Sequence, residues 1–369
     1  MTNIQKKKIV FVLLSLEGGG AERVIINIIR HLDNRLYEVF LILFEAKGPY
    51  LSSIPGYVNL YDLKKTKSGL FSILKIIFSL IIIFRKIRPN TVVSFHNMAN
   101  VITMISRYLS FIKCNLVIGI RHYFHEDLIK SFNVLNLFLY KNLFKYANCI
   151  IVNSAELGKH SAQFFHIKHD KIKVIYNPID FENINNLKNE YLGTLSSDQF
   201  ILAVGRLSHE KGFPYLLKAF SLIKEKIHEN LVILGKGPDE EMLKKMASDL
   251  DIKERVLFLG FQSNPYKFMR NARIFVLSSL YEGFPNVLLE AMACGAPAIS
   301  TNCPSGPGEI IENYNNGILV PTADEKALAV AMLNLLKDEN LRKKFSLEGS
   351  KRVEDFSIEK LMSQYEHLF

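Results

Sequence analysis

Cysteine is scarce in this sequence, and its distribution argues against both disulfide bonds and a cysteine-bound metal. The chain contains four cysteines, Cys114, Cys149, Cys294 and Cys303, and no two of them form a Cys-x-x-Cys pair. Disulfide-stapled domains are dense in cysteine, and structural zinc sites use closely spaced pairs. We therefore expect reduced thiols in a cytoplasmic protein, with neither disulfide bonds nor a cysteine-bound metal.

Long apolar runs are missing as well. The most apolar stretch, residues 70–84, is interrupted by Lys75 and is shorter than the roughly 20 residues that a membrane-spanning helix needs. Basic residues flank this stretch, which fits a buried helix or one at a membrane surface, and we favour the buried helix. Residues 9–14 follow three lysines but precede no small-residue cleavage site, so we expect a first strand there and not a signal peptide.

Two nucleotide-binding signatures are also absent. No G-x-G-x-x-G dinucleotide fingerprint and no P-loop Lys-Ser/Thr pair follows the glycine-rich turn at residues 18–20. Their absence argues against a nicotinamide-dependent or P-loop phosphate-transferring enzyme.

Acidic residues are depleted in the first half of the chain. Residues 1–180 hold 24 Lys and Arg against 11 Asp and Glu, a net charge of +13, whereas residues 181–369 hold 22 against 25, a net charge of −3. A basic half suggests a polyanionic partner. Because interleaved aromatic and basic motifs are missing, we expect an anionic membrane surface and no nucleic acid. Ordinary solvated lysine is the alternative.

The order of the predicted elements indicates two α/β domains. A chain of 369 residues exceeds one typical hydrophobic core. Short β-rich runs alternate with helical patterns, which is typical of parallel sheets built from βαβ units. The expected strands are residues 9–14, 39–44, 91–95, 116–120, 149–152, 173–176, 200–204, 231–234, 256–259, 274–277, 298–300 and 317–320. The expected helices lie near residues 21–32, 70–87, 101–110, 134–146, 155–165, 215–226, 239–250, 286–293, 325–337 and 341–353. A polar stretch after Asn177 and Pro178, up to residue 198, is the expected linker. We therefore place one domain at residues 1–180 and begin the second at residue 181, with a cleft between them and ligands at the carboxyl ends of the strands.

The stretch from residue 278 to residue 297, SSLYEGFPNVLLEAMACGAP, holds the most informative pattern. Pro285 and Asn286 predict a helix start, and Gly295 predicts its end. Glu282 then lies in the loop before the helix, and Glu290 lies about one turn inside it. Free amides at a helix start favour an anion, and carboxylates accept hydrogen bonds from hydroxyls. This combination suggests a nucleotide-sugar site.

A second motif, VGRLSHEKGF at residues 204–213, follows the first strand of the second half. Arg206 can donate to two phosphate oxygens at once, and Lys211 adds a point charge on the same loop. Together they predict a diphosphate that is neutralised by side chains and not by a metal ion. A solvated basic loop, with Glu210 paired to one cation, is the alternative.

Polar residues also follow strands of the first half. Gly19 and Gly20 follow the first strand and open a helix, where the backbone can approach a phosphate, although such a turn is often only structural. His96 follows one expected strand, and Arg121 and His122 follow another. A histidine at a strand end is more often a packing residue than a catalytic one.

Taken together, GGGAERV, VGRLSHEKGF, LGKGP and EGFPNVLLEAMACGAPAIS, in this order and spacing, resemble the family 4 retaining glycosyltransferases of GT-B fold. The resemblance covers nearly the whole chain. It implies two Rossmann-like domains with parallel sheets facing a central cleft. The first would be the acceptor-side domain, and residues 181–355 would be the nucleotide-sugar domain. A terminal helix at about residues 356–369 would pack back on the first domain.

The resemblance also implies roles for the singled-out residues. Arg206 and Lys211 would bind the donor diphosphate, Glu290 the ribose hydroxyls and Glu282 the transferred sugar. His122 would be the histidine at the reaction centre, with His96 and Arg121 on the acceptor side. The catalytic set is then Glu282, His122, Arg206 and Lys211. The implied donor-binding set is Gly19, Gly20, Arg206, Lys211, Glu282, Gly283, Phe284, Pro285, Asn286 and Glu290.

CPSGPGEII at residues 303–311 looks like bacterial enzymes that use UDP-hexose or UDP-N-acetylhexosamine in O-antigen, capsule or lipid-linked oligosaccharide assembly. The implied activity is metal-independent, cofactor-free retaining transfer to a polyprenyl-diphosphate-linked or lipopolysaccharide-type acceptor. The enzyme would be peripheral on the inner face of the cell membrane. A non-catalytic sugar-nucleotide-binding partner, or a transferase with another nucleotide sugar and a soluble acceptor, stays open as an alternative.

Overall fold

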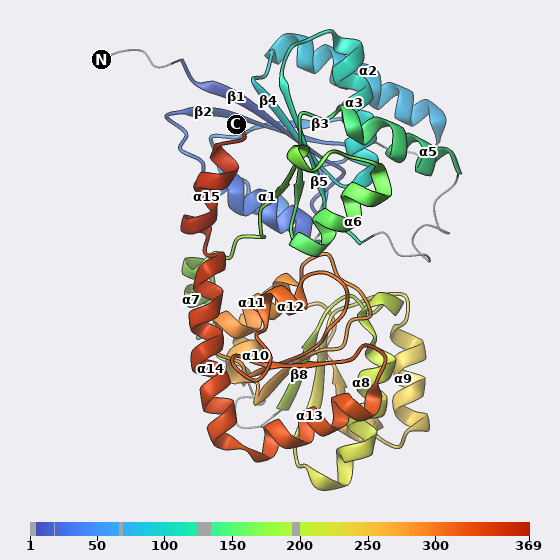
Figure 1. Ribbon diagram of the computed structural model, residues 1–369, viewed down its shortest axis with the longest axis vertical. Coiled ribbons are helices and arrows are strands. Elements are labelled where there is room, and N and C mark those ends of the chain that lie inside the picture. The colour runs from blue at the N-terminus through green and yellow to red at the C-terminus, as the bar shows by residue number, and fades with distance from the viewer. Residues whose placement is uncertain (1–4, 18, 66–68, 124–133, 194–199) are drawn as a thin grey trace. The chain divides into compact units, whose positions relative to one another are not determined.

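The computed structural model describes residues 5–17, 19–65, 69–123, 134–193 and 200–369 (Figure 1). The chain forms two units, and each has its own parallel sheet and core. Unit 1 comprises Met1–Pro178 together with Ile358–Phe369, and unit 2 comprises Ile179–Ser357. Gly18 of the predicted glycine turn and residues 194–198 of the predicted linker lie outside the described residues.

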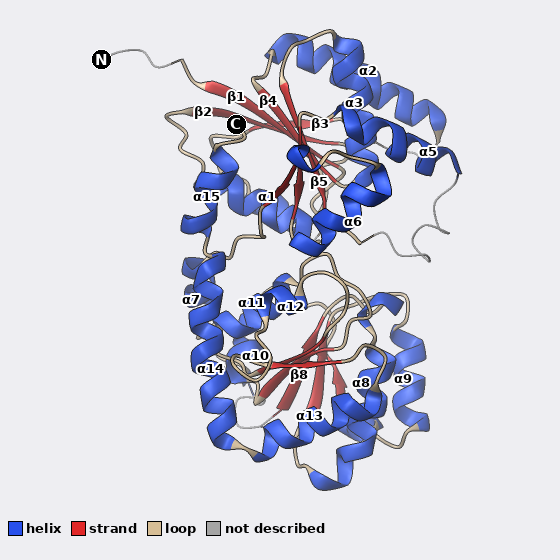
Figure 2. Cartoon of the chain, viewed as in Figure 1, coloured by secondary structure: helices blue, strands red, loops and turns tan. Residues whose placement is uncertain are grey.

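Unit 1 is built on a seven-stranded parallel sheet with the order β3-β2-β1-β4-β5-β6-β7. The central strand β1 is buried from Ile9 to Leu13, because helices cover both faces of the sheet (Figure 2). A parallel strand covered on both faces needs a continuous apolar run, and KKIVFVL supplies one. The strands are β1 (Lys7–Leu13), β2 (Tyr37–Leu43), β3 (Asn59–Asp62), β4 (Thr91–Phe95), β5 (Asn115–Ile120), β6 (Cys149–Val152) and β7 (Ile172–Val174).

The described helices of unit 1, apart from the C-terminal one, lie between successive parallel strands, as βαβ units require. Ser154 begins one of them, since its hydroxyl accepts a hydrogen bond from the Leu157 amide at 3.1 Å. The helices are α1 (Gly20–His31), α2 (Leu70–Ile87), α3 (Asn97–Ser110), α5 (Val134–Leu143), α6 (Ala155–Phe165) and the C-terminal α15 (Ile358–Glu366).

The last twelve residues of the chain complete the core of unit 1. Helix α15 lies beside α1 (Figure 1). The Phe369 ring meets the edge of Phe11 at 5.9 Å and that of Tyr37 at 6.4 Å between ring centroids. The Thr91 hydroxyl donates to the Phe369 carbonyl at 3.2 Å. These residues therefore belong structurally to unit 1, although they follow unit 2 in sequence.

Unit 2 carries a six-stranded parallel sheet with the order β10-β9-β8-β11-β12-β13. Its strands are β8 (Phe200–Val204), β9 (Asn230–Leu234), β10 (Val256–Phe258), β11 (Ile274–Leu277), β12 (Ala298–Thr301) and β13 (Ile318–Val320). Its helices are α7 (Phe181–Leu187), α8 (Phe213–Ile223), α9 (Glu240–Asp249), α10 (Tyr266–Asn271), α11 (Asn286–Ala293), α12 (Pro307–Ile310), α13 (Glu325–Lys337) and α14 (Glu339–Val353).

The predicted fold class, two α/β domains with parallel sheets, is confirmed. Among the strands and α-helices of the described residues, strand β3 and helices α7 and α10 were not predicted. Strand β3 lies at the sheet edge and has the mostly exposed sequence NLYD, so it lacks an apolar signal. Helix α7 falls within the predicted linker, where the Asp180 side chain accepts from the Asn183 amide at 2.9 Å and begins the helix.

Helix α2 differs from the buried helix that we favoured. Its residues Ile76, Leu80, Phe84 and Ile87 face the core, but a second apolar stripe faces solvent. We call this second set the α2 stripe: Leu70, Phe71, Leu74, Phe78 and Ile82. Phe71 is 90% exposed and Phe78 is 65% exposed. Among the described helices, none has both the length and the hydropathy that crossing a membrane would require.

We predict that Phe369→Ala lowers the free energy of unfolding by about 3 kcal/mol, because it removes a large buried side chain from the unit 1 core. The matched control is Phe71→Ala, since Phe71 is 90% exposed and its truncation should change stability by less than about 0.5 kcal/mol. Urea denaturation followed by circular dichroism measures both. Equal losses in the two variants would contradict the assignment of Phe369 to the core.

Candidate functional site

The sheet of unit 2 reverses its strand order between β8 and β11. Loops from the carboxyl ends of these two strands diverge there, which is the usual ligand position in open α/β sheets. The loop after β8 carries Arg206 and Lys211, and the loop after β11 carries Glu282. The fold therefore brings the two strongest sequence motifs to one crevice of one unit.

A close backbone contact fixes the two loops against each other. Gly212 has a φ of +62°, and a Cβ atom at this position would lie only 2.1 Å from the Ser278 carbonyl oxygen. The Ser278 hydroxyl donates to the Lys211 carbonyl at 2.8 Å, and the Leu280 amide donates to the Glu210 carbonyl at 2.9 Å. Only glycine permits this approach without strain.

Lys211 and Glu282 are directly bonded across the crevice. The Lys211 Nζ donates to Glu282 Oε1 at 2.6 Å, and the Ser279 hydroxyl donates to the same oxygen at 2.6 Å. The side chains are 21% and 9% exposed. Burial to this degree strengthens the pair, because water screens it little. Lys211, which we expected at the diphosphate, and Glu282, which we expected at the sugar, thus form an ion pair with each other.

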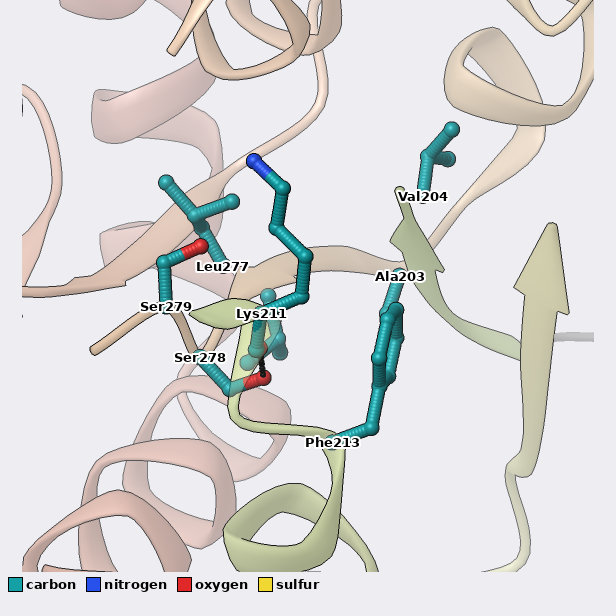
Figure 3. A pocket seen from close by; sticks show the side chains of 8 residues that line it. Ala203, Val204, Lys211, Phe213, Leu277, Ser278 and Ser279 are labelled. Carbon is teal, nitrogen blue, oxygen red and sulfur yellow. Dashed lines mark hydrogen bonds between the residues drawn. The ribbon is translucent and has the colours of Figure 1, made fainter. Parts of the chain in front are cut away.

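Figure 3 shows how Lys211 lies in the small pocket at this point. Its side chain extends from the loop with Ser278 and Ser279 on one side and Phe213 and Val204 on the other. The ammonium group lies at the far end of this extended side chain, where it bonds to Glu282.

Arg206 differs from Lys211 in its surroundings. Its side chain is exposed, and it makes no hydrogen bond or ion pair with any of the described residues. The crevice thus offers one cation that is already paired and one that is free to meet an anion.

The loop at residues 283–286 is held by a contact with the loop after β12. The Ser305 hydroxyl donates to the Gly283 carbonyl at 2.6 Å. The Phe284 ring packs on Phe356 with 5.6 Å between centroids, so only the backbone of Phe284 is available to a ligand. Pro285 is the N-cap of α11 and Asn286 its first residue, and Gly295 ends the turn after α11 with a φ of +85°, as predicted.

Glu290 lies on α11 and is buried in unit 2. Two nearby thiols are affected by the site carboxylates. Burial and then the charge of Glu290 raise the pKa of Cys294 to about 12, and burial and then Glu282 raise the pKa of Cys303. All four cysteines are free. These two thiols stay protonated at neutral pH and are poor nucleophiles.

Unit 1 reverses its strand order between β1 and β4, and a pair of titratable side chains, Glu22 and His96, spans this second crevice. Gly19 is the N-cap of α1, and Gly20 is its first residue. The Glu22 carboxylate folds back against Gly19, where a Cβ atom would come within 2.2 Å of Glu22 Oε2. Its other oxygen lies 3.5 Å from His96 Nε2. A carboxylate therefore occupies the helix start at which we expected a phosphate.

His96 is held in an unusual conformation at the end of β4. Its φ is +77°, which is uncommon for a residue with a side chain. Burial and then the charge of Arg121 lower the pKa of His96, and burial raises the pKa of Glu22. Both groups are thus shifted toward their neutral forms. Residues in sparsely populated backbone regions cluster at functional sites.

Arg121 and His122 follow β5, as predicted, but their environments differ. Arg121 is 6% exposed, whereas the neighbouring His122 is exposed. Arg121 Nη1 donates to Asn177 Oδ1 at 2.6 Å. The structure places Arg121 beside the end of β4, since its guanidinium lies over the ring of Phe95, the residue before His96.

Sequence reasoning missed several residues that hold these two crevices. Glu22, Ser279, Ser305 and Asn177 were not singled out, although each lies within or beside a motif that was. The available signal was position: each follows the carboxyl end of a strand or opens the helix after it. Which of them are buried and bonded depends on strand order, and the sequence alone does not reveal that order.

Two protein-family models match the chain, one in each half. Residues 18–183 match Glycosyltransferase Family 4, and residues 188–352 match Glycosyl transferases group 1. The two matches together span most of the chain.

Curated relatives match over nearly the full length. One is the Campylobacter jejuni N-acetylgalactosamine-N,N'-diacetylbacillosaminyl-diphospho-undecaprenol 4-alpha-N-acetylgalactosaminyltransferase, which is 32% identical over 96% of this chain and 97% of its own. Another is the capsular polysaccharide biosynthesis glycosyltransferase CapM of Staphylococcus aureus, which is 30% identical over 83% of each chain.

A solved structure shares the fold. The Anabaena protein HepE, in complex with UDP and glucose, aligns over 98% of each chain with a TM-score of 0.82 and 20% identity. At this identity the likeness establishes the fold alone. With both halves matched and relatives aligned end to end, the chain belongs to the family 4 glycosyltransferases of GT-B fold.

Proposed function

We propose that this glycosyltransferase moves a hexose or N-acetylhexosamine from a UDP-sugar to a glycan acceptor carried on polyprenyl diphosphate or on lipopolysaccharide. The observation that carries the proposal is the crevice between β8 and β11. It holds the bonded pair of Lys211 and Glu282 beside the exposed cation of Arg206. Such a set suits a ligand that joins a diphosphate to a hydroxyl-rich sugar.

The relatives support the choice of substrates. The Campylobacter jejuni relative is named for an undecaprenol-diphosphate-linked acceptor and for an α-linked product. HepE was solved with UDP and glucose. Retention of configuration yields an α-linked product when the donor sugar is α-linked to its diphosphate, which agrees with the name of that relative.

The proposed mechanism assigns the diphosphate to cations and backbone amides, without a metal ion. As the bond from the sugar to the diphosphate breaks, negative charge builds on the leaving oxygen. Arg206 is free to meet this charge, while Lys211 would share its proton donors between the diphosphate and Glu282. The acceptor hydroxyl would attack the same face of the oxocarbenium-like sugar. Glu282 would contact the transferred sugar and Glu290 the ribose.

Unit 1 supplies the acceptor side in this proposal. His122 would lie at the reaction centre, and Gly19 and Gly20 would approach the donor with their backbone. Since the Glu22 carboxylate lies against Gly19, this turn would favour hydroxyl groups over phosphate oxygens. His96 and Arg121 would belong to the acceptor site.

We further propose that the protein docks on an anionic membrane through α2 and α3, which lie side by side in unit 1 (Figure 1). The α2 stripe is apolar and exposed. Between Asp62 and Glu126 the sequence has ten Lys and Arg and no Asp or Glu. An exposed apolar stripe with basic surroundings is typical of helices that lie in a lipid interface.

The first test removes the free cation. Arg206→Ala should weaken UDP binding about 10- to 100-fold, because it deletes charge-assisted hydrogen bonds to the diphosphate. Arg270→Ala, at an exposed arginine of the same unit, is the matched control and should bind UDP as the wild type does. Isothermal titration calorimetry with UDP measures both. Unchanged affinity in Arg206→Ala would remove the role of Arg206.

The second test separates sugar contact from nucleotide binding. Glu282→Gln should lower turnover at least about 10-fold, whereas UDP affinity should stay level or rise, because Lys211 loses its carboxylate partner. Turnover is measured with a panel of UDP- and GDP-sugars and lipid-linked acceptors, read by product mass and anomeric configuration. Glu210→Gln, on the loop after β8, is the control. Wild-type turnover in Glu282→Gln would refute the assignment.

The third test concerns the membrane. The double variant Phe71→Ser and Phe78→Ser should reduce binding to phosphatidylglycerol vesicles by about 10-fold or more, since each buried phenyl ring contributes roughly 2 kcal/mol. Rising salt should weaken wild-type binding as well. The control carries Leu222→Ser and Phe261→Ser, two exposed apolar residues of unit 2. Equal binding by both double variants, or salt-insensitive binding, would count against docking through α2.

A further inference from the structure

The guanidinium group of Arg121 is held by contacts on one face and on one edge. Its guanidinium carbon lies 4.0 Å from the centroid of the Phe95 ring, a cation–π contact. The ring in turn lies over Gly119, where a Cβ atom would come within 2.4 Å of it. Nη1 donates to Asn177 Oδ1 at 2.6 Å. The guanidinium plane and its orientation are therefore set by Phe95 and Asn177.

The remaining edge of this guanidinium is unused. Nε and Nη2 are both buried, and neither finds a hydrogen-bond partner among the described residues. These two nitrogens form the edge whose N–H bonds run parallel and match two oxygens of one phosphate or carboxylate. A buried guanidinium that is half paired is costly, and such unsatisfied groups in native proteins usually have a functional reason.

An anion is favoured at the open edge of Arg121 and disfavoured beside Glu22. Across the crevice, Glu22 presents a carboxylate oxygen that also has no partner among the described residues. His96 stands between α1 and β5 and is shifted toward its neutral form. A ligand with both hydroxyls and an oxyanion would therefore place a hydroxyl at Glu22 and the oxyanion at Arg121.

We infer that unit 1 contains an oxyanion site formed by the Nε–Nη2 edge of Arg121, with Phe95 and Asn177 as positioning residues, and that its ligand is a phosphate of the diphosphate-linked acceptor. The identity of the acceptor rests on the proposed function. The donor is the other source of a diphosphate, but Arg206 and Lys211 of unit 2 are assigned to it. Acceptor and donor both carry a diphosphate, so the experiment must distinguish binding of one from binding of the other.

The test measures binding of farnesyl diphosphate, a short soluble polyprenyl diphosphate, and of UDP to the full-length protein by calorimetry. Arg121→Lys keeps the charge but loses the two-nitrogen edge. It should weaken farnesyl diphosphate binding about 10- to 100-fold and leave UDP affinity within about twofold. Arg107→Lys is the matched control, because Arg107 also has an unpartnered Nε while its Nη2 donates to the Cys114 carbonyl at 3.3 Å.

A second variant guards against loss of folding. Asn177→Asp has nearly the same shape, retains an acceptor for Nη1 and places a negative charge beside the guanidinium. It should weaken farnesyl diphosphate binding about 10-fold while the melting temperature holds or rises. If Arg121 served only to support the fold, this variant would bind farnesyl diphosphate as the wild type does.

Three results would overturn the inference. One is loss of UDP affinity in Arg121→Lys with farnesyl diphosphate binding intact, which would assign the edge to the donor. Another is unchanged binding of both ligands in Arg121→Lys and Asn177→Asp, which would mean that the edge holds only buried water. The third is wild-type protein that transfers sugar but does not bind farnesyl diphosphate. Loss of UDP binding in Arg206→Ala with sugar transfer by the wild type would still support the proposed function in each case.

Discussion

The contact between Gly212 and the Ser278 carbonyl is the constraint on which the rest of the site depends. It brings the loop after β8 against the loop after β11, and the Ser278 hydroxyl holds the Lys211 carbonyl in place. Lys211 and Glu282 can then bond at 2.6 Å although 71 positions separate them in sequence. Any side chain at position 212 would push the loops apart. The pair would then lose its geometry before either charged residue had been changed.

The two crevices use the same topology with opposite arrangements of charge. In unit 2 the reversal of strand order presents a free arginine beside a bonded lysine and carboxylate. In unit 1 it presents a carboxylate at a helix start, a strained histidine and a buried arginine with one open edge. A helix start would ordinarily attract phosphate, but Glu22 already occupies this one. In the inferred oxyanion site, an anion would therefore bind not at this helix start but at Arg121, which follows β5.

Much of this fold was predictable because central parallel strands carry an unmistakable signal. The runs that became β6, β8 and β11 are continuously apolar, and β4 is interrupted only by Ser94 after Val92 and Val93; the observed bounds of all four equal the predicted ones. Strand β3 was missed since an edge strand with exposed residues needs no such run. The positions of Arg206, Lys211 and Glu282 on loops after β8 and β11 were also predictable, because both strands are recognisable in the sequence. Their bonding was not, because it follows from the order of the strands in space.

Helix α2 shows where periodicity stops being informative. A helix with one apolar face reveals which side meets the core, but α2 is apolar on nearly every side, so its pattern cannot distinguish burial from exposure. The structure resolves this: Ile76, Leu80 and Phe84 fill the core, and the α2 stripe remains in solvent. Packing against the sheet explains the first set only. Exposed phenylalanines in a segment without a single acidic residue are the basis of the proposed membrane docking, since a lipid interface would provide both an apolar environment and the opposite charge.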